Sequence, residues 1–140
     1  MKYDDASWHY GGNFPEDLPK SFAATHIGMF VAWCLLNGLS GDIYNDELAE
    51  ELEQLNMRKQ TPGEWFINNC DEKFTDEDLN ELGNSFAQAF YDAEYLVIYE
   101  NCLGKEYDSL YEVPDTWDSY DNLSLGLKNS FNNWLQKRIQ

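Results

Sequence analysis

The sequence predicts an all-α fold: a single-domain bundle of about five helices around a buried central helix, with an irregular N-terminal arm. Three observations lead to this prediction. One segment near the N-terminus is apolar almost all round, several later segments carry apolar residues three and four positions apart, and helix-capping patterns precede two of them. The 140 residues are enough for one domain, residues 1–140, with a substantial core.

The composition combines a net charge of -17 with 43% hydrophobic and 16% aromatic residues. Disordered acidic chains are poor in aromatic residues, so this chain is expected to fold. All 26 acidic residues lie at or before Asp121, and the segment 122–140 carries only basic charges. A charge of this size destabilises a compact chain through self-repulsion, so we expect it to serve a purpose, such as fast capture of a basic partner.

Residues 1–19 are expected to form an ordered but irregular arm. Gly11-Gly12, Pro15 and Pro19 are turn signals. The aromatic residues of the arm, including Trp8, are expected to anchor it on the body of the protein. Loss of a buried aromatic side chain costs about 3–5 kcal/mol, so Trp8→Ala is expected to damage the fold.

The segment from Ser21 to Asn37 predicts the central helix. Apolar residues such as Ile27, Phe30 and Trp33 occupy nearly its whole circumference. A helix that is apolar on every side is a buried one. Asn37-Gly38 is a typical helix end.

Two further helices are predicted in the middle of the chain. Between Asp46 and Met57, leucines recur three and four positions apart, and glutamates cover the other side. Thr61-Pro62-Gly63-Glu64 places a threonine cap before a proline at the first helical position and a glutamate at the third. This pattern predicts a short helix that ends near Cys70.

Thr75-Asp76-Glu77-Asp78 is a second capping pattern, and the helix after it is expected to run towards Gly104. Residues Tyr95 to Tyr99 also have strand propensity, but the apolar spacing favours a helix there. Residues Lys105 to Thr116 predict a loop. Leucines and aromatic residues between Leu123 and Leu135 then predict a final amphipathic helix.

The sequence contains no recognisable cofactor or metal motif. Cys34, Cys70 and Cys102 are an odd number at wide spacing, which excludes a disulfide framework and is typical of a reducing compartment. The acidic windows depart from the calcium-loop pattern at the required glycine and at ligand positions. Nucleotide-binding, zinc-protease and nucleophile-elbow motifs are absent. We therefore expect no metal, no cofactor and reduced thiols.

The sequence also lacks a recognisable leader or membrane segment. Met1-Lys2 is followed by acidic residues, and the longest apolar run, Ile27 to Leu36, is too short to span a bilayer. A cytoplasmic location without membrane contact is expected. Direct binding to nucleic acid is disfavoured, because phosphates are bound mainly by cations.

Two histidines are the candidate acid–base groups. His9 follows Asp4-Asp5 in the arm, and His26 lies on the predicted central helix. If the arm folds back so that both histidines share a pocket, Asp5, His9 and His26 would form the site of a small enzyme. The favoured alternative is that Trp8 and His9 pin the arm to the core and that His26 is hydrogen-bonded within it.

The acidic clusters are the candidate partner-binding surfaces. Tyrosine and tryptophan lie among their charges, and exposed aromatic side chains are typical anchors of protein interfaces. A solvated, solubilising surface is the alternative for each cluster. The residues expected to bind a partner are Glu47, Glu50, Glu51, Asp76, Glu77, Asp78, Asp115 and Asp118.

Two parts of the chain resemble an uncharacterised family of small bacterial proteins. The first is Tyr3-Asp4-Asp5-Ala6-Ser7-Trp8-His9-Tyr10-Gly11-Gly12-Asn13-Phe14-Pro15, with Ala24 to Phe30 and Trp33 to Leu39; the second is Tyr111 to Trp117, with Tyr120-Asp121. The family has no assigned catalytic activity, so the resemblance implies no functional residues. By class analogy, small acidic proteins of this kind resemble the immunity proteins of bacterial toxin systems.

The expected function is therefore that of an immunity-type protein. It would neutralise a toxin or effector domain by occluding it through an acidic, aromatic-containing surface. The partner would be a basic protein, drawn in by electrostatic steering and held by aromatic anchors. The alternatives are an acidic adaptor or regulatory domain, including a nucleic-acid mimic, and the small enzyme that uses Asp5, His9 and His26.

Overall fold

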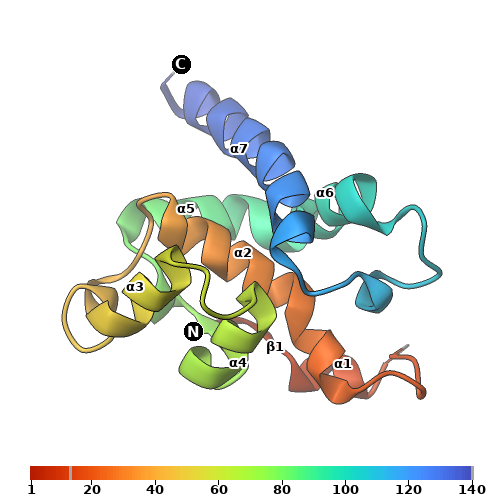
Figure 1. Ribbon diagram of the computed structural model, residues 1–140. Helices are drawn as coiled ribbons and strands as arrows, with labels where there is room; N and C mark the ends of the chain where they lie inside the picture. The colour runs from red at the N-terminus through yellow and green to blue at the C-terminus, as the bar shows by residue number, and fades with distance from the viewer. Residues whose placement is uncertain (13, 140) are drawn as a thin grey trace.

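The computed structural model describes residues 1–12 and 14–139, so Asn13 of the predicted arm and Gln140 of the predicted domain lie outside the described residues. The fold is mostly helical, as predicted, with one small two-stranded sheet. Figure 1 shows α2 (Thr25–Leu36) in the middle of the molecule, with the other helices arranged around it. Among the described residues, no helix is both long enough and apolar enough to cross a membrane.

The prediction of a buried central helix is confirmed. A 3-10 turn, Lys20–Ala24, leads into α2, and every residue of α2 from Thr25 to Leu35 is buried. Gly38 follows the helix with a φ of 81°, a conformation that glycine adopts without strain. The apolar circumference read from the sequence therefore corresponds to a helix that is covered on all sides.

The N-terminal arm is more regular than predicted. β1 (Lys2–Asp5) pairs antiparallel with β2 (Lys73–Thr75), and Asp4 lies opposite Phe74. The chain then turns into the short helix α1 (Ser7–Tyr10). Neither strand was predicted, because two segments so short and so polar pair only when the rest of the fold brings them together.

The prediction that Trp8 anchors the arm is wrong. Its side chain is 56% exposed, and the Lys2 ammonium lies 5.7 Å from the centroid of its ring. The side chain that enters the core here is that of Ala6, which directly precedes α1 and is fully buried, whereas no residue of α1 is buried. Trp8 therefore lies on the outer face of this single helical turn.

Of the two helices predicted in the middle of the chain, the first begins later than predicted and the second begins at its predicted cap. α3 (Ala49–Asn56) begins later than predicted, after a 3-10 turn at Asp42–Tyr44. At the start of α4 (Pro62–Cys70), the Thr61 hydroxyl accepts from the backbone of Glu64, whose carboxylate accepts from the backbone N–H of Thr61. The capping box predicted from the sequence is thereby confirmed.

The capping pattern at Thr75 opens only a 3-10 turn, Asp76–Asp78, and not the long helix that was predicted. Leu79 then takes an extended backbone conformation and bridges to Ser40. The helix α5 (Glu81–Phe90) begins two residues later, where the side chain of Asn80 caps it. Pairing with the chain after α2 has therefore outweighed the local helix signal.

The segment from Tyr95 to Tyr99 is helical, as the apolar spacing favoured. A π-helical turn, Tyr91–Tyr95, connects α5 to α6 (Leu96–Tyr99), and a second one, Glu100–Gly104, follows. A 3-10 turn at Leu110–Glu112 interrupts the predicted loop. The chain ends in α7 (Trp117–Ile139), whose C-terminal part extends beyond the body of the molecule in Figure 1.

We expect Gly28→Ala to lower the free energy of unfolding by about 1–3 kcal/mol through overpacking. Gly28 lies where α2 meets α4, and a β-carbon there would come within 2.9 Å of the Pro62 carbonyl oxygen and 3.1 Å of the Gly63 α-carbon. Backbone atoms of α4 cannot turn aside as a side chain can. Urea denaturation measures the effect, and Gly11→Ala is the control, because nothing lies within 4 Å of its added β-carbon. Equal stabilities of the two variants would contradict this packing.

Candidate functional site

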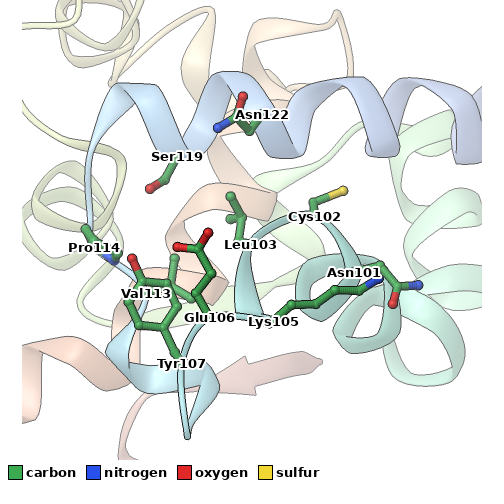
Figure 2. A pocket seen from close by; sticks show the side chains of 10 residues that line it. All are labelled: Asn101, Cys102, Leu103, Lys105, Glu106, Tyr107, Val113, Pro114, Ser119 and Asn122. Atoms are coloured by element: carbon green, nitrogen blue, oxygen red, sulfur yellow. The ribbon is translucent and has the colours of Figure 1, made fainter.

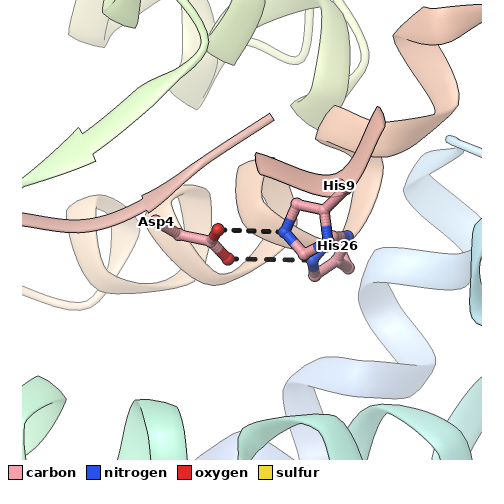
Figure 3. A group of neighbouring side chains, drawn as sticks. All are labelled: Asp4, His9 and His26. Atoms are coloured by element: carbon pink, nitrogen blue, oxygen red, sulfur yellow. Dashed lines mark hydrogen bonds and ion pairs between the residues drawn. The ribbon is translucent and has the colours of Figure 1, made fainter. Parts of the chain in front are cut away.

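Three side chains from three different elements meet at the N-terminal end of α2. Asp4 comes from β1, His9 from α1 and His26 from the first turn of α2, and Figure 3 shows the carboxylate of Asp4 facing both imidazole rings. One carboxylate oxygen, Oδ1, lies 2.9 Å from His9 Nε2. The other, Oδ2, lies 3.8 Å from His26 Nε2, beyond hydrogen-bond distance. The two imidazole rings meet edge to face, with their centroids 4.7 Å apart.

The local fold explains this meeting. Pairing with β2 holds β1 against the core and buries Asp4. The pairing ends where the Ala6 N–H donates to the Glu72 carbonyl, and the turn into α1 then brings His9 back over Asp4. His26 is already fixed in the buried first turn of α2.

Further polar groups hold Asp4 and His9 in place. The Tyr91 hydroxyl donates to Asp4 Oδ2 at 2.6 Å, and the backbone N–H of Asp5 donates to Asp4 Oδ1 at 2.8 Å. The Tyr111 hydroxyl lies 2.7 Å from His9 Nδ1. Because a carboxylate only accepts, the network assigns the His9 proton to Nε2 and leaves Nδ1 to accept from Tyr111.

Burial shapes the charges of the group. Burial alone would raise the pKa of Asp4, but hydrogen bonds from His9 and Tyr91 outweigh it, so the pKa lies below its ordinary value. Burial lowers the pKa of His26 to about 3, and the neighbouring His9 acts in the same direction. At neutral pH the group therefore holds an ionised carboxylate beside a neutral imidazole.

His26 is the anomalous member of the group. Its side chain is 1% exposed, yet neither ring nitrogen has a hydrogen-bond partner among the described residues. An unsatisfied buried polar group costs about 1–3 kcal/mol, and such groups are rare enough to require an explanation. The sequence-based expectation of a hydrogen-bonded core histidine is therefore half right, since His26 is buried but unpaired.

A cavity of about 370 Å³ gives the group a route to solvent. Asp4 and His9 line it together with Tyr91, Trp8 and Leu96. An aspartate–histidine pair that borders a cavity has the chemistry of a general base. In addition, ligand atoms of Asp4, His9 and His26 all lie within 4.8 Å of one another, so a modest approach of the three side chains would allow them to share a metal ion.

The sequence-based enzyme hypothesis named the wrong aspartate. Asp5 accepts from the Lys2 ammonium at 2.9 Å and from the Ser7 hydroxyl at 2.8 Å, and it does not take part in the group. Burial opposes ionisation of Asp5, but these hydrogen bonds prevail and bring its pKa down to about 2. Asp4 occupies the position expected for Asp5. Asp4, His9 and His26 have no metal-ligand spacing in the sequence, but folding brings their ligand atoms together.

The predicted partner-binding residues are spread over three parts of the fold, and three of them, Asp76, Asp78 and Asp115, are held by contacts within it. Asp78 is buried and accepts from the Tyr44 hydroxyl at 2.7 Å and from the backbone of Thr75 at 2.9 Å. Asp115 accepts from the Gly63 N–H and the Thr61 hydroxyl. Among the predicted residues, Glu51 and Asp76 are half-buried, and Glu47, Glu50, Glu77 and Asp118 are exposed.

Exposed acids and an aromatic ring gather between α6 and α7. Glu100, Glu106, Tyr107 and Asp108 are all exposed there, and we call them the Tyr107 surface. Figure 2 shows a cavity of about 320 Å³ between this segment and the beginning of α7. A second cavity, of about 390 Å³, shares Tyr107 with the first. Sequence reasoning placed acids in this region but gave no sign of the cavities.

No curated protein and no solved structure was found to match this chain. One family model matches a part of the chain that includes both the strand with Asp4 and the central helix with His26. This model, described as a domain of unknown function, DUF7832, matches residues 2–113, and the chain therefore belongs to this family.

Proposed function

We propose that this chain is a cytoplasmic immunity-type protein that neutralises a basic toxin or effector domain by binding over it. The observation that carries the proposal is negative charge that is not paired with cations of the same chain. Among the described residues, the carboxylates paired with a lysine, an arginine or the N-terminal amine are only Asp5, Asp71, Asp76 and Asp121. The chain has 26 acidic residues, so most of its negative charge is free to attract a partner.

One acidic surface is formed by α3 and the turn that precedes it. Asp46, Glu47, Glu50 and Glu53 are exposed and have no cationic partner among the described residues, and we call them the α3 surface. Charges of one sign on the rim of an interface raise the association rate more than they strengthen the final complex. We therefore assign steering of the partner to this surface.

The Tyr107 surface is assigned the anchoring role. Tyr107 is 37% exposed, lies between two acidic neighbours and borders two cavities. Tyrosine is enriched among the residues that dominate binding energy. Such residues lie in well-packed pockets near the centre of an interface. A basic domain that covers this surface would meet carboxylates around a central ring, whereas nucleic acid would be repelled.

The protein encoded by the neighbouring open reading frame is the partner to test. Its expression alone should arrest growth, and co-expression of this chain should restore growth if the two form a toxin–immunity pair. Tyr107→Ala should weaken the rescue, while Trp8→Ala, which removes another exposed aromatic side chain, should not. A harmless neighbour, or growth arrest that this chain does not relieve, would contradict the proposal.

Kinetics on the purified pair separate the two surfaces. Truncation of an anchor residue costs about 2 kcal/mol, so Tyr107→Ala is expected to accelerate dissociation by more than about tenfold. Its association rate should change little, because the charges that steer the partner remain. Surface plasmon resonance measures both rates. An unchanged dissociation rate would exclude Tyr107 as the anchor.

A further inference from the structure

We propose that Asp4, His9 and His26 bind a divalent transition-metal ion of the zinc class. This site goes beyond the proposed partner binding, because it lies on β1, α1 and α2 and shares no residue with the α3 surface or the Tyr107 surface. Two imidazoles and one carboxylate are a ligand set that zinc and related ions use in proteins.

The distances suit a shared ion. Ligands about 2.0–2.1 Å from a tetrahedral ion lie about 3.3 Å from one another. Asp4 approaches His9 at 2.9 Å and His26 at 3.8 Å, and these two separations bracket that value. The three ligand atoms together lie within 4.8 Å of one another, so the side chains must draw closer to share an ion. The two carboxylate oxygens of Asp4 face different imidazoles, as Figure 3 shows, and small shifts of the three side chains would bring one donor from each onto one ion.

The unpaired nitrogens of His26 are the independent observation that points to a ligand. If His26 only filled space in the core, an apolar side chain would stabilise the fold more, because burying ring nitrogens without hydrogen bonds costs free energy. His26 instead directs Nε2 towards the Asp4 carboxylate at a distance too long for a hydrogen bond. An ion between them would satisfy Nε2 of His26 and the Asp4 carboxylate.

The contacts around Asp4 and His9 are those expected of a metal site, whereas His26 Nδ1 has no partner among the described residues. Metal-binding histidines usually have a partner on the second ring nitrogen, and their carboxylate neighbours are hydrogen-bonded in turn. With His9 Nε2 on the ion, the His9 proton lies on Nδ1 and is donated to the Tyr111 hydroxyl, 2.7 Å away. The Tyr91 hydroxyl holds Asp4 Oδ2 at 2.6 Å. Tyr91 stems from the π-helical turn Tyr91–Tyr95, a feature that often marks functional sites.

The ion has a route and an open coordination position. The cavity of about 370 Å³ is lined by Asp4 and His9 and by one further carboxylate, Asp92. The Lys2 ammonium also borders it but is paired with Asp5 at 2.9 Å. Three protein ligands with a fourth position towards solvent are typical of metal sites that bind water or a substrate.

The test is titration of the chelator-treated, dialysed protein with Zn²⁺ by isothermal calorimetry. One equivalent should bind, and Asp4→Asn and His9→Gln should each weaken binding on the order of 100-fold or more, because each removes a ligand. Tyr111→Phe should weaken it by about tenfold, because it removes only the partner of His9. Asp92→Asn and Cys102→Ser, which change a nearby carboxylate and a competing thiol, should bind as the unchanged protein does.

His26→Gln alters a fully buried side chain and can unfold the protein, so the decision rests on His9→Gln, whose position is part-exposed. Circular dichroism checks that each variant is folded. Co²⁺ replaces Zn²⁺ in a second measurement, where a thiolate charge-transfer band should be absent. The proposal is overturned if stoichiometric Zn²⁺ fails to bind, if His9→Gln binds it unchanged, or if the cobalt spectrum shows thiolate ligation.

Discussion

Replacing Trp65 by alanine is expected to lower the free energy of unfolding by about 3–5 kcal/mol, among the largest effects of any single truncation in this chain. Trp65 is 1% exposed, and its ring lies 6.0 Å from that of Tyr44. Its indole N–H donates to the Glu51 carbonyl at 2.8 Å and so joins α4 to α3. Urea denaturation, followed by circular dichroism, measures the change.

Trp8→Ala is the matched control, because it removes the same side chain from the surface. At 56% exposure, Trp8 loses little buried area, and the change should stay within about 0.5 kcal/mol. A loss near that of Trp65→Ala would show that α1 buries Trp8. It would thereby contradict the arrangement that turns His9 towards Asp4.

Replacing Asp78 by alanine is expected to cost about 3 kcal/mol. Its carboxylate accepts from the buried Tyr44 hydroxyl and from the backbone N–H of Thr75. A donor left unsatisfied in the interior costs about 1–3 kcal/mol, and this substitution removes the acceptor of two donors. The Tyr44 hydroxyl retains only a weak contact with Cys70 Sγ at 3.5 Å. Burial raises the pKa of Asp78 above its ordinary value, although the hydrogen bonds from Thr75 and Tyr44 lower it. The cost of burying the carboxylate therefore offsets part of the stabilisation that these hydrogen bonds provide.

Glu77→Ala is the control for Asp78→Ala, since Glu77 is the exposed neighbour in the same turn. It should leave the urea midpoint almost unchanged. The comparison of these two variants also shows whether Asp78 can be used to test partner binding. If Asp78→Ala were as stable as Glu77→Ala, Asp78 would be a surface carboxylate after all and would return to the set of candidate binding residues.

Local signals predicted the helical part of the fold. The apolar circumference of residues 21–37 and the cap at Thr61 act within one or two helical turns, and both are confirmed. The cap at Thr75 is equally local and is present, yet it starts a turn instead of a long helix. Leu79 pairs with Ser40, which is far away in the sequence, and no pattern in either segment announces that pairing.

The candidate site was only partly predictable. His9 and His26 were identified as the titratable pair, and their sharing of a pocket depended on whether the arm folds back. The structure brings them together through β1 and β2, two strands without a sequence signature. Tyr91 and Tyr111 lie 87 and 102 positions from their respective partners, so spacing could not reveal them. Asp4 and Asp5 are adjacent in β1, where successive side chains point to opposite faces, so the register of the strand decides which of them faces the histidines.

The α3 surface offers a clean charge-reversal experiment. The sequence suggested Glu47, Glu50 and Glu51, but Glu51 is half-buried, with one carboxylate oxygen enclosed. Glu53 is exposed and takes its place. The triple variant Glu47→Lys, Glu50→Lys, Glu53→Lys therefore changes the field of the surface without disturbing buried groups, whereas reversal at Asp76 or Asp78 would also break contacts of the fold.

The association rate of this chain with its basic partner, measured against salt concentration, tests the central claim most directly. Charges are screened over about 8 Å at physiological ionic strength, so association should slow steadily as salt rises. At low salt the triple variant should associate at least about tenfold more slowly and lose most of this dependence, with little change in dissociation. A salt-independent association rate, shared by the unchanged protein and the triple variant, would contradict capture through the acidic surface.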